Sequence, residues 1–284
     1  MSVPPETYLD EFPSDWQLME LGSIANVKGG KRLPKGAEYA DTITDHAYLR
    51  VTDFENLSVN LADLKYISED VHEHVARYTI SSDDVYISIA GTIGLVGTIP
   101  DELNGANLTE NAAKIVVLDQ DVLHARFLAY WLSSPQGQAE TRLRTTKTSQ
   151  PKLALMRIRQ IPIPLPPLAE QRRIAGVLNT IQDAIAAQED VIAAARELKR
   201  SLMQRLFTYG PYREPAETKE TEIGEIPVHW EMVEFGSQVD LLSGYAFKSE
   251  HYTDDYNAPR LLRGDNIAQG RLRWDNEKRW PLDG

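Results

Sequence analysis

Apolar residues recur at alternating spacings of three and four along a proline-free segment between residues 168 and 207. This heptad stripe, interrupted at Gln188 and Lys199, comprises Ile174, Leu178, Ile181, Ile185, Ile192, Ala195, Leu202 and Leu206. It predicts a single helix on the order of 60 Å long. The helix should start after the extended, proline-rich residues 161–167 and stop at Gly210-Pro211. A stripe of this period requires a partner helix; the alternative is a long helix lying on its own domain.

The segments before this helix have other patterns. Residues 84–99 are rich in β-branched residues and punctuated by glycines, which predicts short strands joined by tight turns. Residues 113–118 predict another strand. Residues 122–132 predict a helix that has Leu123, Phe127, Leu128 and Trp131 on one side. The fold class expected is α+β.

An internal repeat sets the predicted organisation. Residues 12–23 recur as residues 226–237, and both copies contain the pattern Trp-x4-Leu/Phe-Gly-Ser. Residues 49–54 recur as 262–267, and Gly30 pairs with Gly244 at nearly the same offset. We therefore predict a whole α+β unit at 1–165, a spacer helix at 166–210 and the truncated start of a second α+β unit at 211–284. The alternative to a truncation is a poorly ordered tail.

Composition excludes several classes of protein. The 284 residues include no cysteine, which excludes disulfides, zinc knuckles and thiolate chemistry. No apolar run is long enough to cross a bilayer, and residues 1–15 hold four acidic residues and no basic one, unlike a signal peptide. A soluble, cytoplasmic protein with no membrane partner is expected.

The net charge of −12 argues against nucleic-acid binding, but the basic residues are clustered. Residues 1–165 hold 15 basic against 22 acidic residues. No acidic residue occurs between Thr141 and Ala169, where six basic residues lie, and a second basic cluster spans Lys28 to Lys35. Each cluster can be a nucleic-acid contact or an ordinary solvated face.

The stretch Leu165-Pro-Pro-Leu-Ala-Glu170-Gln171, opening a long helix between two copies of the Trp-x4-Leu/Phe-Gly unit, resembles the specificity subunit of type I restriction-modification systems. The Ser88-x-x-Gly91-Thr92-Ile93-Gly94 and Asn107-x3-Asn111-Ala112 stretches are similar to that family's target-recognition domain. The resemblance covers essentially the whole chain.

This resemblance implies a non-catalytic protein that reads a bipartite site in double-stranded DNA with two target-recognition domains. Two long helices between the domains would form an antiparallel coiled coil, which sets the half-site spacing and docks modification (methyltransferase) subunits. A restriction/translocase subunit would join for cleavage. The chain itself would need no cofactor, since S-adenosylmethionine and ATP belong to these partners.

The chain departs from the family by ending at Gly284, before a second long helix. The stripe therefore has no partner within the sequence. One hypothesis is that the helix self-associates in antiparallel fashion and gives a two-fold homodimer that reads a pseudo-palindromic site.

Residue types able to bind bases and phosphates are concentrated in the loop-like segment 141–152. There we expect DNA contacts from Arg142, Arg144, Lys147, Thr148, Ser149, Gln150 and Lys152. Further candidates are Lys31 and Arg32, then Lys35 and Arg50, while Thr92 and Asn107 follow from the resemblance.

Other functions fit the sequence less well. Glu197 and Lys199 lie in the long helix and make a poor nuclease centre, and neither a methyltransferase motif nor a phosphate loop is present. His72-Glu-His74 predicts a surface turn rather than a metal site, and no metal site is expected. A structural adaptor that assembles through its long helix without DNA specificity remains the alternative.

Overall fold

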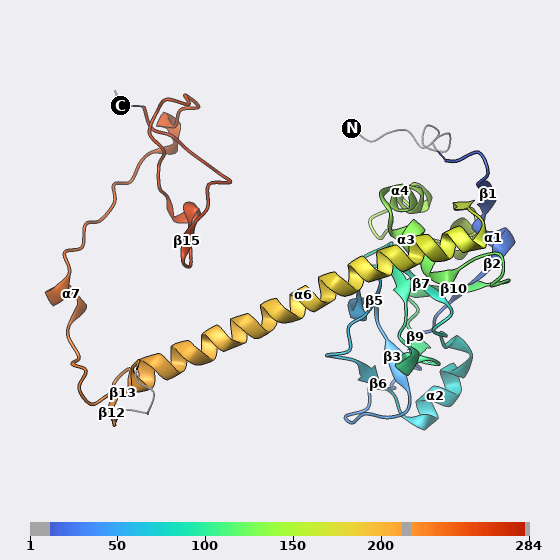
Figure 1. Cartoon of the computed structure of the whole chain (residues 1–284), viewed down its shortest axis with the longest axis horizontal. Coiled ribbons are helices and arrows are strands. Elements are labelled where there is room, and N and C mark those ends of the chain that lie inside the picture. Colours follow the sequence, from blue (N-terminus) through green and yellow to red (C-terminus); the bar gives the residue numbers. More distant parts are fainter. Residues whose placement is uncertain (1–11, 212–216, 282–284) are drawn as a thin grey trace. The chain divides into compact units, whose positions relative to one another are not determined.

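A four-stranded antiparallel sheet organises the first unit of the chain (Figure 1). The computed structural model describes residues 12–211 and 217–281, and the chain divides into two units, residues 1–197 and 198–284. In spatial order the sheet consists of β2 (Ala25–Gly29), β10 (Ala112–Val117), β7 (Val85–Ser88) and β8 (Val96–Thr98). The strands predicted within 84–99 and at 113–118 are confirmed.

Smaller strands surround this sheet. A three-stranded sheet has the order β6 (Lys65–Tyr66), β3 (Ala47–Leu49) and β9 (Asn107–Leu108), and its β3–β9 pair is parallel. A tight hairpin joins β4 (Phe54–Glu55) to β5 (Ser58–Val59). The proline-rich segment forms β11 (Pro162–Leu165), which pairs with β1 (Gln17–Glu20) in a two-stranded ribbon where proline is tolerated.

Five short α-helices complete the described part of the first unit. They are α1 (Leu21–Ile24), α2 (Glu69–Val75), α3 (Ala125–Ser133), α4 (Pro135–Arg144) and α5 (Leu155–Ile158). The predicted helix at 122–132 is thus confirmed, but it starts three residues later, because His124 is the N-cap and its side chain accepts from the Phe127 N–H.

The main core lies between the sheet and α3. Val85 and Ile115 from the sheet and Leu128 and Leu132 from α3 are fully buried in one hydrophobic cluster. Full burial of such a side chain contributes about 1.5–3 kcal/mol. The central sheet is therefore a rigid platform for the loops at its ends.

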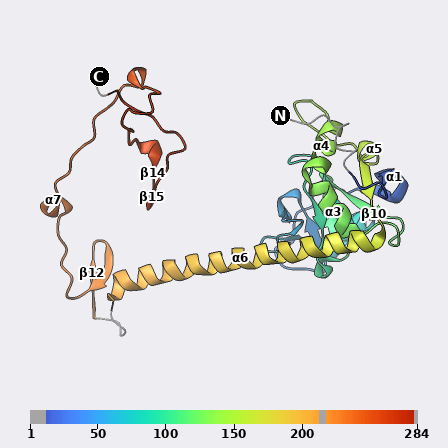
Figure 2. The ribbon, with the colours of Figure 1, turned by 45° about the horizontal axis from the view of Figure 1, so that its top comes forward.

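The predicted long helix is α6 (Leu168–Tyr209), 42 residues in length. Both views show it as one uninterrupted helix (Figure 2). It ends where expected: Gly210 has a φ of +80° and donates its N–H to the Leu206 carbonyl, a glycine C-cap. Among the described residues, no helix combines the length and apolar character needed to cross a membrane.

Only the beginning of α6 is covered by the first unit. Ala175 is buried and Ile174 packs against the main core, so Ile174 lies against its own domain and not on a free seam. Ile181 and Ile185 are 52% and 45% exposed, and Ile192, Leu202 and Leu206 are similarly exposed. From Ile181 to Ile192, the apolar stripe of α6 is therefore not covered by the unit to which it belongs, contrary to the alternative of a helix lying on its own domain.

After α6, the described residues of the second unit form two hairpins and one short α-helix. The hairpins are β12 (Thr218–Thr221) with β13 (Gly224–Pro227), and β14 (Ile267–Ala268) with β15 (Arg271–Leu272). Between them lies α7 (Phe235–Gln238).

The sequence repeat is also a repeat of local structure. Ser23 Oγ donates to the Glu20 carbonyl at 2.7 Å, and Ser237 Oγ donates to the Glu234 carbonyl at the same distance. Short helices follow at the same place in both copies, α1 and α7. The two segments therefore encode the same turn.

A second part of the repeat is built around an arginine. The Arg50 N–H donates to the Asp53 carboxylate and its guanidinium to the Asp63 carbonyl, both at 2.7 Å. Arg263 makes the same two contacts, with the Asn266 side chain and the Asn276 carbonyl, each at 3.1 Å. In both copies a β-hairpin follows directly, β4–β5 and β14–β15.

The two copies of the repeat differ at the segment that forms β2 in the first copy. Val27 in β2 is 1% exposed because β2 pairs with β10, whereas its counterpart Leu241 is 72% exposed and pairs with no strand in the described part of the second unit. The boundaries 1–165, 166–210 and 211–284, and the truncation, stay predictions.

Candidate nucleic-acid interface

Backbone hydrogen bonds bring four segments together at one end of the central sheet. The Gly30 N–H donates to the Ala112 carbonyl at 3.0 Å, and the Ile89 N–H donates to the Asn111 carbonyl at 2.8 Å. The Leu153 N–H in turn donates to the Ile89 carbonyl at 3.0 Å. We call this end of the sheet the loop end; it comprises residues 29–35, 89–94, 109–111 and 146–152.

Nine of the residues predicted to contact DNA are exposed at the loop end: Lys31, Arg32, Lys35, Thr92, Lys147, Thr148, Ser149, Gln150 and Lys152. Among the described residues, the side chains of Lys35, Lys147 and Lys152 form no ion pair. Ammonium groups without an internal partner are available to phosphates. The fold thus gathers side chains that are up to 121 positions apart in the sequence, from Lys31 to Lys152, on one surface.

The predicted loop at 141–152 is only partly a loop. Residues 146–152 form a turn closed by hydrogen bonds between Thr146 and Lys152, and a β-bridge joins Lys152 to Ala90. Arg142 and Arg144 instead belong to the last turn of α4, so a loop conformation was the wrong prediction for them. Arg142 is exposed there.

Arg144 has an internal role. Its guanidinium pairs with the carboxylate of Glu140, whose side chain is 4% exposed, and donates to the Gln160 carbonyl at 2.8 Å. A buried carboxylate needs this compensation. Arg144 therefore neutralises Glu140 and ties α4 to the end of α5, which leaves it little freedom to contact DNA.

Asn107 is buried away from the surface, with 1% of its area exposed. Its Nδ2 donates to the Val75 carbonyl at 3.0 Å, and its Oδ1 lies 2.8 Å from Nδ1 of His72. The His72 ring stacks on that of His46 with a centroid distance of 3.8 Å. Asn107 thus fastens α2 to β9, and nothing in its surroundings offers a base edge access to it.

The His72-Glu-His74 segment lies in α2 and not in a surface turn as predicted. Helical residues 72 and 74 do not face each other, and His74 Nδ1 contacts the Asp70 carbonyl. In the part of the chain that the structure describes, no three potential metal ligands come together.

Arg50 likewise has a structural role. Besides the contacts shared with Arg263, its guanidinium pairs with Asp53 Oδ1 at 2.6 Å, and the Asp53 side chain is 4% exposed. Arg50 does line a cavity beside Arg32, so it can face a ligand only through the edge that Asp53 and Asp63 leave open.

This cavity, about 870 Å³ in volume, contains residues that the sequence did not indicate. They include Tyr39, Tyr48, Thr52 and Glu110. Tyr39 and Tyr48 lie 5.9 Å apart between ring centroids, and burial raises the pKa of Tyr48 to about 12. Basic, amide and hydroxyl residues were expected to contact DNA, so the acidic and aromatic members of this surface were not predicted. Asn111, which the resemblance included, lines the cavity together with the predicted Arg32 and Arg50.

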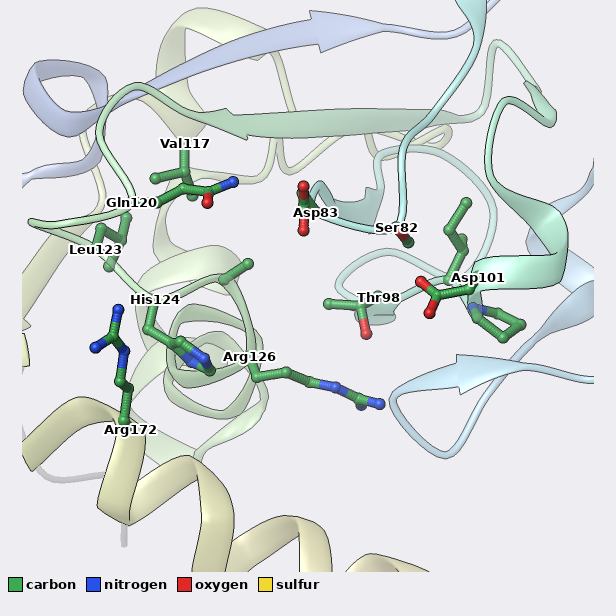
Figure 3. A pocket seen from close by; sticks show the side chains of 13 residues that line it. Ser82, Asp83, Thr98, Asp101, Val117, Gln120, Leu123, His124, Arg126 and Arg172 are labelled. Atoms are coloured by element: carbon green, nitrogen blue, oxygen red, sulfur yellow. The ribbon is translucent and has the colours of Figure 1, made fainter. Parts of the chain in front are cut away.

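A second cavity, about 460 Å³ in volume, lies at the opposite end of the central sheet (Figure 3). In the close-up, Arg126 and Arg172 lie across the cavity from Asp83 and Asp101. Within the described residues these two arginines form no ion pair with either carboxylate. Burial, followed by the charges of Arg172 and Arg126, lowers the pKa of His124.

Next to this cavity, the start of α6 is joined to the rest of the first unit by a buried glutamine. Gln171 is completely buried; its Oε1 accepts the His124 N–H at 2.9 Å, and its Nε2 donates to the carbonyls of Val122 and Pro166 at 2.9 and 2.8 Å. Tyr130 of α3 adds a hydrogen bond to Asn179 of α6. These contacts fix the start of α6 on the domain that carries the loop end.

Comparison with known protein families matches residues 13–195 to the family described as the type I restriction modification DNA specificity domain. Similar proteins include the MjaVIII specificity subunit of Methanocaldococcus jannaschii, 37% identical over 123 residues, which are 43% of this chain and 28% of that protein. The MjaIX specificity subunit of the same organism is 22% identical over 93% of the chain and 61% of its own length. The EcoBI specificity subunit of Escherichia coli is 26% identical over 72% of this chain and 44% of its own length. The chain spans no more than 61% of the length of any of these three relatives.

Solved structures show the same fold. A type I restriction-modification system S subunit from M. genitalium superposes with a TM-score of 0.52 at 16% identity, covering 86% of this chain and 58% of that one. A chain from a study of complex assembly in the type I R-M system gives a TM-score of 0.50 at 24% identity. The match covers 69% of this chain and 48% of that one. The α+β fold class is thereby confirmed. Since the family match extends over more than half of the sequence, the chain belongs to the type I restriction-modification DNA specificity domain family.

Proposed function

We propose that the chain is a DNA-recognition subunit of a type I restriction-modification system and that its first unit reads one half of a bipartite duplex site through the loop end. The observation that carries this proposal is the gathering of nine exposed, predicted DNA-contacting side chains on one end of a rigid sheet. Family membership supports the same role.

The charge of the chain fits a protein that binds DNA together with the partner subunits that the family implies. The first unit is acidic overall, and only its localised basic segments attract phosphates, so we expect it to bind DNA weakly alone. Modification subunits that enclose the duplex would supply the remaining affinity and the methyl-transfer chemistry, and a restriction/translocase subunit would add cleavage. The chain itself performs no catalytic step in this proposal.

The exposed stripe of α6 supports assembly through this helix. Isoleucines that are about half exposed on a heptad seam are stabilised when a second helix covers them. The occupant we propose is the α6 of a second copy, antiparallel to the first, which would place two loop ends on one duplex. Light scattering tests this point: a monomer at micromolar concentration would contradict the homodimer and leave the DNA-reading role intact.

The test of the function is selection from a pool of random duplexes, using the full chain together with the modification subunit of its own system. The proposal predicts enrichment of one defined sequence, with an affinity at least about 10³-fold above that for a scrambled duplex. A pool that stays random after repeated rounds would contradict DNA recognition and favour a structural adaptor.

A further inference from the structure

Arg32 combines an exposed side chain with a fixed orientation. Its side chain is 78% exposed, yet its Nε donates to Oε1 of Glu110 at 2.6 Å. The two terminal nitrogens of the guanidinium make no hydrogen bond to any described residue. The ion pair through Nε therefore leaves the end of the guanidinium, with one N–H from each terminal nitrogen, without a partner among the described residues.

Glu110 is itself held in place. Thr109 Oγ1 donates to Oε2 of Glu110 at 3.0 Å, so both carboxylate oxygens have a partner. Burial alone would raise the pKa of Glu110, but the hydrogen bonds from Arg32, its own backbone and Thr109 lower it below the ordinary value. The carboxylate is therefore ionised at neutral pH.

The backbone that carries Arg32 is equally constrained. The Lys31 N–H donates to the Leu108 carbonyl, and the Tyr48 hydroxyl donates to the Lys31 carbonyl, both at 2.8 Å. A Cβ on Gly30 would lie 2.1 Å from the Thr109 carbonyl oxygen, so only glycine permits this close approach. These contacts fix the position of the segment that carries Arg32 relative to the segment that carries Glu110.

A carboxylate beside an exposed arginine has opposite consequences for the two possible DNA contacts. Near a phosphate, Glu110 would add like-charge repulsion and reduce affinity. Near a base edge, it holds Nε and leaves two parallel N–H donors, the arrangement that pairs with the O6 and N7 acceptors of guanine in the major groove. Lys35 nearby has no carboxylate partner among the residues that the structure describes, which fits a phosphate contact.

We propose that Arg32 reads one guanine of the half-site and that Glu110 is the positioning residue that orients it. This inference rests on the proposed function, since it names a specificity-determining residue of the same interface.

The test compares the full chain and four variants, each with the modification subunit, on the selected duplex and on duplexes with single base-pair changes. Arg32→Ala and Arg32→Lys should each lose about 5- to 150-fold of discrimination at one G·C pair and none elsewhere. Glu110→Gln should weaken discrimination at that same pair. Lys35→Ala is the matched control: it should keep the sequence preference and flatten the salt dependence of binding by about one unit.

The outcomes separate the inference from the function. A wild-type chain with no sequence preference overturns both. A specific wild-type chain whose Arg32→Lys variant keeps the full preference overturns the inference alone, because a phosphate contact tolerates lysine. If Glu110→Gln keeps the full sequence preference while Arg32→Ala loses discrimination at the G·C pair, the positioning role of Glu110 is overturned. Equal melting temperatures of the variants verify that each one folds.

Discussion

Gln171 connects the long helix to the domain that carries the loop end, and its replacement by leucine is a direct test of that connection. Leucine approximates the volume of glutamine but cannot form the hydrogen bonds to His124, Val122 and Pro166. The change leaves one N–H and two carbonyl groups without their partner in a buried site. Each costs about 1–3 kcal/mol when unsatisfied, so allowing for relaxation we expect a loss of about 3 kcal/mol in the free energy of unfolding.

This loss is a large fraction of the roughly 5–15 kcal/mol typical of a domain. Urea denaturation followed by tryptophan fluorescence should show a midpoint lower by roughly 1–2 M at an unchanged slope. Gln204→Leu, at an exposed position of the same helix and off the apolar stripe, is the matched control and should change stability by less than about 0.5 kcal/mol. If both variants behave alike, Gln171 does not anchor α6 and the reasoning is refuted.

Three further changes test other parts of the structure. Arg50→Met removes the partner of the buried Asp53 carboxylate and should lower the free energy of unfolding by about 2–3 kcal/mol in urea denaturation; an unchanged midpoint would contradict its structural role. Because burial raises the pKa of Tyr48 to about 12, its neutral phenol stabilises the fold fully below pH 10. Wild type should therefore lose stability relative to Tyr48→Phe as pH rises from 10 to 12, and parallel pH profiles would disprove this. The double variant Lys147→Ala, Lys152→Ala should flatten the salt dependence of DNA binding by about two units, and an unaltered slope would exclude the turn from the interface.

Periodicity was sufficient to predict the elements that depend on local sequence. The stripe from Ile174 to Leu206 predicted α6, and Gly210 marked its end, because helix formation and capping depend on residues within a few turns. The stripe could not show that Ile174 packs on the first unit, since this contact is with residues distant in the sequence.

Residue type alone did not show which candidate side chains have structural partners distant in the sequence. Asn107 has a residue type suited to base readout, but its side chain contacts His72, 35 positions away, and the Val75 carbonyl. Arg50 could have been recognised as structural, since the repeat places Arg263 at the equivalent position with the same contacts. A residue that recurs with the same contacts in both copies of the repeat suits a role in the local fold that the copies share.

Glu110 was not predicted at this surface, because the residue types that bind bases and phosphates were expected to be basic, amide or hydroxyl. Glu110 is 78 positions from Arg32, and only the pairing of β2 with β10 brings the two segments together. The surface for DNA was predicted from its basic residues, whereas one of them, Arg32, forms an ion pair with Glu110.

Site-specific photocrosslinking tests most directly whether DNA is bound at the loop end. A photoreactive amino acid placed at Thr148, and at Leu118 at the opposite end of the same central sheet, compares two exposed positions in one folded chain. With the modification subunit and the selected duplex present, the account predicts crosslinks to DNA from position 148 and none from position 118. Crosslinks from position 118 and none from position 148 would contradict it.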